Sequence, residues 1–171
     1  MDEASISHTL EVPWLQVEPL VLGPVPTGQD TPHCYVCVGD PNPSGLRIDV
    51  YAHRDHYCFR EDAVLIGGML FIGVGHRLFA IQISTHSVLA HDLDCYFGYL
   101  HRLSDSVLVA TGCSLYRFAL DGSLGWVATN LAVDGLLVRH VRDDIVVLDA
   151  EQDPPGQWEH VCVSLHTGLV I

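Results

Sequence analysis

The sequence contains no lysine, and basic residues of any kind are scarce. All 8 of its basic residues are arginine, they stand against 21 acidic residues, and the formal net charge is −13. The missing lysine by itself indicates no more than a GC-rich coding bias. The negative charge repels phosphate backbones, so we expect no nucleic-acid binding. It suits solubility and a basic protein partner.

Long hydrophobic runs are also missing. No apolar stretch reaches the roughly 18 residues that a membrane-spanning helix needs. The first residues, MDEASISH, are acidic and polar, and they lack the positive start and the apolar stretch of a secretory signal. We therefore expect a cytoplasmic protein without membrane contact, whose 6 cysteines stay as thiols.

Catalytic motifs are absent from the sequence as well. There is no GxSxG motif for a serine nucleophile. The glycines at 67, 68, 73 and 75 lack the Lys-Ser/Thr pair of a phosphate-binding loop, and they fit tight hairpin turns and bulges instead. The sequence therefore names no catalytic residue and no cofactor, and it favours a protein without enzymatic activity.

What the sequence does contain is a repeated strand pattern. Residues 69–75 (MLFIGVG) align with 106–112 (SVLVATG), 37 positions later, and 78–83 align with 115–120 at the same shift. A third copy begins at Ile145 and continues at 161–165. Each unit holds about four short strands in about 40 residues, which is typical of propeller blades or similar meanders.

These repeats predict an all-β fold of repeated antiparallel meander sheets, arranged as three to four short propeller-like blades. A β-sandwich of the same meanders is the alternative. We expect one domain, in which residues 1–60 form an irregular sheet and residues 61–171 form three repeats of approximately 37–45 residues.

The first 60 residues are less regular. Residues 34–38 and 46–51 alternate like strands around a Gly/Pro-rich turn and predict a hairpin. Residues 1–9 read as a loose lead-in. Residues 10–22 read as an edge strand broken by Pro13 and Pro19, of which 10–15 is the candidate closing strand. Residues 57–60 are a further candidate strand.

One segment carries a family resemblance. YRFALDGSLGW, residues 116–126, resembles the strand–turn–strand of PQQ-type β-propeller blades, in which an aromatic-apolar strand, an Asp- or Thr-Gly turn and a Trp follow one another. Residues 79–89 and 163–170 are weaker versions, so the resemblance covers residues 61–171. It implies blade-like sheets. Trp126 has no counterpart in the other copies, and three copies are fewer than the family's closed ring contains, so its cofactor is not carried over.

The strongest metal candidate combines Cys34 and Cys37 with His53 and His56. Zinc takes thiolates and imidazoles tetrahedrally, and two such pairs from one hairpin would close a site. Residues 34–38 read as a strand, however, and residues three apart on a strand face opposite sides. Unrelated buried thiols and surface imidazoles are the alternative explanation.

Aromatic residues near turns supply the remaining clue. Trp and Tyr are favoured contact residues because they bury a large area at a small entropic cost. Tyr96 and Tyr99 belong to the densest cluster, and Trp158 follows an acidic, Pro-rich hairpin at 151–157 that is longer than its repeat requires. Extra length on one repeat often marks a binding face. The predicted partner-binding residues are Trp158, Asp153, Glu151, Glu159, Tyr96 and Tyr99.

Three functional hypotheses follow. The first is a non-enzymatic interaction module that binds a basic protein partner, for example a toxin-immunity-like neutraliser. The second is a small-ligand or zinc-binding β protein that uses Cys34, Cys37, His53 and His56, with an enzymatic role left open. The third is a subunit of a homo-oligomer that donates its apolar C-terminal strand, residues 168–171, to a neighbour.

Overall fold

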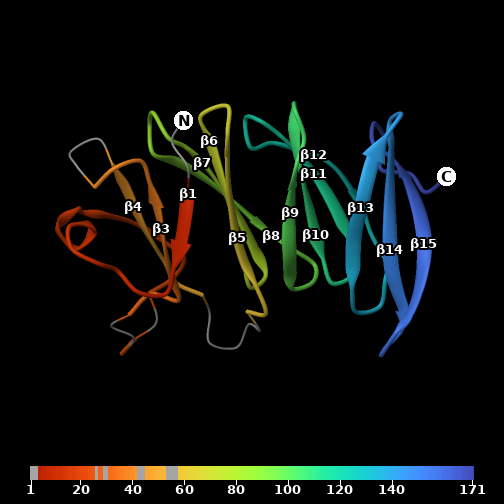
Figure 1. Ribbon diagram of the computed structural model, residues 1–171, viewed down its shortest axis with the longest axis horizontal. Helices are drawn as coiled ribbons and strands as arrows, with labels where there is room; N and C mark the ends of the chain where they lie inside the picture. Colours follow the sequence, from red (N-terminus) through yellow and green to blue (C-terminus); the bar gives the residue numbers. More distant parts are fainter. Residues whose placement is uncertain (1–3, 26, 29–30, 42–44, 53–57) are drawn as a thin grey trace.

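The chain folds into four β-sheets that stand side by side (Figure 1). The computed structural model describes residues 4–25, 27–28, 31–41, 45–52 and 58–171. Within them the only helical element is the single turn η1 (Trp14–Gln16), and no helix is long and apolar enough to cross a membrane. The all-β prediction is confirmed, and so is the arrangement as propeller-like blades rather than a sandwich.

The first sheet has the strand order β1–β3–β4–β2, and the three others are meanders. The first comprises β1 (Ala4–Ser7), β2 (Pro19–Leu22), β3 (Cys34–Val38) and β4 (Leu46–Val50). The second comprises β5 (Glu61–Ile66), β6 (Met69–Val74), β7 (Arg77–Gln82) and β8 (Ser87–Asp92). The third comprises β9 (Phe97–Arg102), β10 (Ser106–Thr111), β11 (Leu115–Ala119) and β12 (Leu124–Ala128). The fourth comprises β13 (Leu136–Arg142), β14 (Ile145–Asp153) and β15 (Gln157–Ser164).

Each sheet packs face to face on the next one through an apolar layer. Successive side chains of a strand point to opposite faces. In β6, Leu70 and Ile72 therefore pack against the first sheet, whereas Met69 and Phe71 pack against the third. The middle sheets are buried on both faces, which explains why β6 and β10 consist almost entirely of apolar residues.

Polar contacts join the edges of neighbouring sheets. The Asp62 carboxylate on β5 accepts the backbone N–H of Leu100 on β9 at 3.1 Å. One sheet further along, the Tyr99 phenol oxygen accepts the N–H of Val138 on β13. An unpaired N–H at a sheet edge is costly when it loses water, so these contacts stabilise the stacked arrangement.

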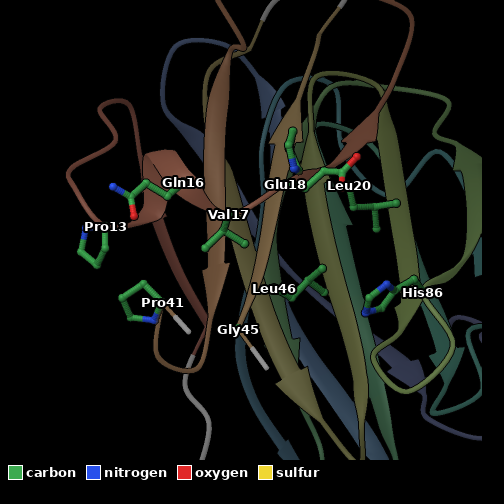
Figure 2. A pocket seen from close by; sticks show the side chains of 10 residues that line it. Pro13, Gln16, Val17, Glu18, Leu20, Pro41, Gly45, Leu46 and His86 are labelled. Carbon is green, nitrogen blue, oxygen red and sulfur yellow. The ribbon is translucent and has the colours of Figure 1, made fainter. Parts of the chain in front are cut away.

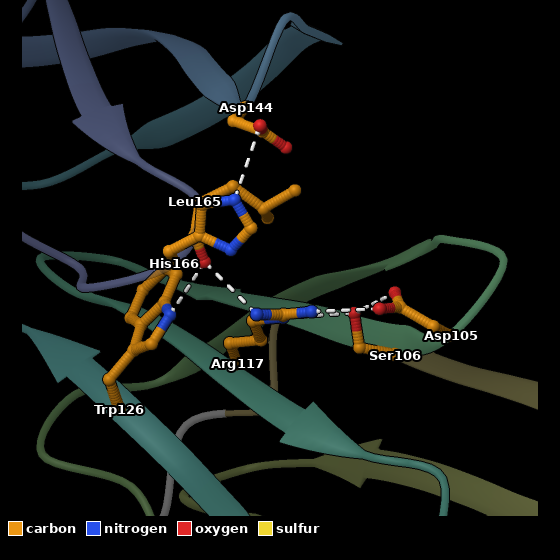
Figure 3. Close-up of polar contacts among 7 residues, drawn as sticks. All are labelled: Asp105, Ser106, Arg117, Trp126, Asp144, Leu165 and His166. Carbon is orange, nitrogen blue, oxygen red and sulfur yellow. Dashed lines mark hydrogen bonds and ion pairs between the residues drawn. The ribbon is translucent and has the colours of Figure 1, made fainter.

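The third and fourth sheets are also joined through Trp126, the residue without a counterpart in the other repeats. Its indole Nε1–H donates to the Leu165 carbonyl at 2.8 Å, and Arg117 donates to the same carbonyl at 3.2 Å (Figure 3). The indole ring lies directly against Gly168. At the equivalent place between the second and third sheets, the smaller Leu89 contacts Gly122.

The first sheet corrects two predictions about the N-terminal region. Residues 1–9 are not a loose lead-in, because Ala4–Ser7 form β1 and pair with β3. The proposed closing strand at 10–15 is wrong. That segment leads into η1, and Arg47 donates to the carbonyls of Trp14, Leu15 and Val17 at 3.3–3.5 Å.

Other predicted strands have mixed outcomes. The predicted hairpin is confirmed as β3 and β4. Of the edge strand predicted at 10–22, only the last part forms a strand, β2, which pairs with β4 in parallel. Residues 58–60 do not form a strand, and residue 57 lies outside the described residues. The C-terminus pairs with its own β15, through a bridge between Val163 and Val170 and a 3.0 Å bond from Ile171 N–H to the Cys162 carbonyl.

We predict that Gly168→Ala destabilises the protein more than Gly39→Ala does. Both glycines have nearly the same positive φ, +73° and +75°, so both substitutions incur the same backbone strain, about 1–3 kcal/mol. A Cβ at Gly168 would also lie 2.7 Å from the Trp126 ring, whereas nothing lies within 4 Å at Gly39. Overpacking adds about 1–3 kcal/mol. Urea unfolding measures the difference, and equal losses would show that the Trp126 contact contributes nothing.

Candidate functional site

Two large hollows of the molecule are poor candidates for the functional site. One, of about 620 Å³, lies between Pro13 and Pro41 on one side and His86 on the other (Figure 2). The other, of about 660 Å³, runs along β5 and is lined mainly by aliphatic side chains. Among the described residues, neither hollow is lined by Phe, Tyr or Trp.

A smaller cleft between the third and fourth sheets gathers aromatic side chains. Its volume is about 210 Å³. We call it the aromatic cleft, and its lining includes Phe59, Arg60, Tyr96, Tyr99, Gly135, Leu137 and Trp158. Two of its aromatic side chains are well exposed, Phe59 at 70% and Trp158 at 43%. This is where side chains from distant parts of the sequence present a shared surface.

Local backbone structure places each aromatic ring. Tyr96 immediately precedes β9 and packs edge-on against Phe59, with 4.9 Å between the ring centroids. Trp158 lies on β15 opposite Glu151 and reaches Gly135, where a Cβ would come within 2.8 Å of the indole. Gly135 is therefore needed for Trp158 to lie against the backbone.

Carboxylates border the cleft. The Tyr96 hydroxyl donates to the backbone carbonyl and to the carboxylate of Asp134, both at 2.9 Å. Burial, followed by this hydrogen bond, raises the pKa of Tyr96 above its ordinary value, so the phenol keeps its proton. Glu151 accepts the Gly156 N–H at 2.6 Å through Oε1, while its Oε2 faces Gly135.

Two arginines lie near the same surface. Arg60 is an exposed residue that lines the cleft. Arg139 is paired with the buried Asp149 carboxylate, whose other oxygen is 2.7 Å from His160 Nδ1. Burial raises the pKa of Asp149, but Arg139 and His160 outweigh burial and hold that pKa below its ordinary value. The charge of Arg139 is therefore compensated locally, and Arg60 is the cation that adds positive charge to the cleft.

The structure brings together four of the six predicted partner-binding residues. Tyr96, Tyr99 and Trp158 line the cleft, and Glu151 adjoins it. Asp153 lies at the end of β14, where the β14–β15 hairpin turns. Glu159 lies on the opposite face of β15 from Trp158, because neighbouring residues of a strand alternate. Phe59, Arg60 and Asp134 were missed, since nothing in the sequence shows that these segments meet.

The predicted metal ligands do not come together within the described residues. Cys34 is fully buried in the layer between the first and second sheets, and burial raises the pKa of its thiol to about 12. Cys37 lies outside that layer, opposite Arg47, because it is three residues further along the strand. His53 and His56 lie outside the described residues. In the described part of the chain, no three His, Cys, Asp or Glu side chains form a metal-binding group.

Comparisons with known proteins show a weak likeness to solved structures. No protein-family model and no curated protein matches the sequence. Among solved structures, the chain is similar to BamB from Moraxella catarrhalis, a PQQ-like β-propeller protein, with a TM-score of 0.40 and 14% sequence identity. The match covers 80% of this chain and 54% of BamB, so the chain spans about half the length of that protein. A likeness of this degree supports no functional conclusion.

We predict that Tyr96→Phe lowers the free energy of unfolding by about 1 kcal/mol at pH 7, because it removes the hydrogen bonds to Asp134. Because the folded-state pKa is raised, this contribution is complete below about pH 10 and is lost progressively above it. Urea unfolding at pH 7 and at pH 10.5 measures both effects. Tyr35→Phe is the control, since its hydroxyl has no hydrogen bond among the described residues. Equal losses in the two variants would contradict the role of Asp134.

Proposed function

We propose that the protein is a non-enzymatic interaction module that holds a basic segment of a protein partner in the aromatic cleft. One observation carries this proposal. Residues from four separate segments, around Phe59, Tyr96, Gly135 and Trp158, meet at one surface and place carboxylates beside exposed aromatic rings. Such a surface supplies both a desolvated contact area and a charge that selects a cation.

The three tryptophans show why the cleft differs from the rest of the surface. Trp126 is held by its hydrogen bond to Leu165 and its contact with Gly168, and Trp14 lies close to Gly45 near the first sheet. Trp158 is the one of the three that is exposed. A large aromatic side chain in that position is a favoured contact residue for a partner.

Electrostatics support a basic partner. The net charge of −13 attracts a basic protein over a distance of about one Debye length, which raises the rate of association. The same charge opposes self-association, which argues against a homo-oligomer. Neutralisation of a basic toxin would be one instance of this chemistry and remains a hypothesis about the partner. No observation favours the small-ligand or zinc alternative over the cleft.

We predict that a tagged form of the protein captures a basic partner from cell extract at low salt, and that Glu151→Gln weakens the capture. Removing the carboxylate beside the cleft should slow association about threefold to tenfold at 50 mM salt, with a smaller effect at 500 mM, because salt screens the attraction. Surface plasmon resonance with the purified partner measures the association rates.

Glu159→Gln is the matched control. It makes the same chemical change with the same net charge, on the neighbouring strand β15 and on the opposite face of the sheet from Glu151. The proposal expects it to bind almost as the natural protein does. Equal losses in the two variants would mean that only total charge matters, and binding that is indifferent to both salt and Glu151 would contradict the proposed site.

A further inference from the structure

We infer that the aromatic cleft is a binding site for the guanidinium group of a single arginine side chain. The guanidinium stacks on Trp158 and pairs with the Glu151 carboxylate. This inference rests on the proposed function and narrows it to one kind of side chain.

The size of the cleft limits what can enter. A volume of about 210 Å³ is open to a side chain. A helix, with a diameter of about 10–12 Å including its side chains, is too wide to enter such a space. Its lining combines three glycines, Gly98, Gly112 and Gly135, with aromatic side chains. A planar group that stacks on an exposed ring fits a space of this size better than a branched or globular group.

Glu151 supplies the counter-charge in a defined direction. Its Oε1 is occupied by the Gly156 N–H at 2.6 Å, which fixes the carboxylate. Its Oε2 lies beside Gly135 in the cleft lining and has no hydrogen-bond partner among the described residues. A carboxylate held by one oxygen and open at the other is ready to accept an N–H from a cation, and charge-assisted hydrogen bonds of this kind are strong.

Arginine fits this arrangement better than lysine. The guanidinium is planar and stacks on aromatic rings. Because it is weakly hydrated, its transfer out of water costs little free energy. An ammonium is compact and strongly hydrated, and a shallow cleft cannot replace its water. The combination of an exposed indole with a fixed carboxylate therefore favours arginine.

Charged groups of both signs lie around this binding site. Asp134 and Glu151 contribute negative charge, while Arg139 is neutralised by Asp149. Arg60 lines the same cleft and opposes a second cation. Removing its charge by Arg60→Gln should therefore strengthen arginine binding, about twofold to threefold at low salt. A purely apolar binding site would not respond in this direction.

The test is a titration of the ¹⁵N-labelled full chain with short peptides, monitored by NMR. The probes are three peptides, acetyl-Gly-Ser-Xaa-Ser-Gly-amide, in which Xaa is arginine, lysine or the neutral isostere citrulline. The indole N–H signals of Trp14, Trp126 and Trp158 are assigned with Trp→Phe variants, and the first two are internal controls. The spectrum of each variant before titration shows whether it is folded.

The inference predicts that the arginine peptide shifts the Trp158 indole signal selectively. It also predicts that lysine binds about threefold and citrulline at least about tenfold more weakly. Glu151→Gln should weaken arginine binding, Glu159→Gln should leave it unchanged, and Arg60→Gln should strengthen it.

Equal binding of arginine and citrulline, or a Trp158 signal that does not move, would overturn the inference. Lysine binding as tight as arginine binding would overturn the preference for a guanidinium. The proposed function fails in a different way, because an extract that yields no salt-sensitive partner leaves the peptide titration unaffected. Conversely, if a captured partner contacts the cleft but the cleft binds the arginine and citrulline peptides equally, only the arginine-binding inference is refuted.

Discussion

The burial of each sheet's face against the next sheet is the constraint on which the rest of the structure depends. A strand such as β6 sends Leu70 and Ile72 to one side and Phe71 to the other, so it needs an apolar neighbour on both faces. Fully burying one such side chain contributes about 1.5–3 kcal/mol. Because the whole benefit arises between sheets, the sheets stabilise one another, and the order of the sheets in space follows their order in the chain (Figure 1).

The candidate site is a consequence of this stacking. Tyr99 shows the connection most clearly, because its hydroxyl accepts the Val138 N–H of the next sheet while its side chain lines the aromatic cleft. Tyr96 likewise joins the start of β9 to Asp134 ahead of β13. The side chains that shape the cleft therefore also hold the third and fourth sheets together, and a change at the sheet junction should alter binding as well as stability.

The sequence predicts those features that depend on local periodicity. The repeated strands and the hairpin of β3 and β4 follow from alternation and turn residues. Features that depend on where a strand lies in space could not be predicted. The residues of β1 have no strand pattern of their own, and they form a strand because they pair with β3. The sequence does not distinguish Glu159 from Glu151, and only the register of β14 and β15 shows that they lie on opposite faces of the sheet. The meeting of Phe59 with Tyr96 depends on sheet stacking, which no local pattern encodes.

The most direct test of the central claim is a hydrogen–deuterium exchange footprint of the captured basic partner on this protein. The account predicts slower exchange at residues 96–99, 134–137 and 151–158, which surround the aromatic cleft, and unchanged exchange in β8 and β12. Protection of β8 and β12 with no change around Trp158 would contradict it, because the partner would then bind the outer strands of the sheets and not the cleft between them.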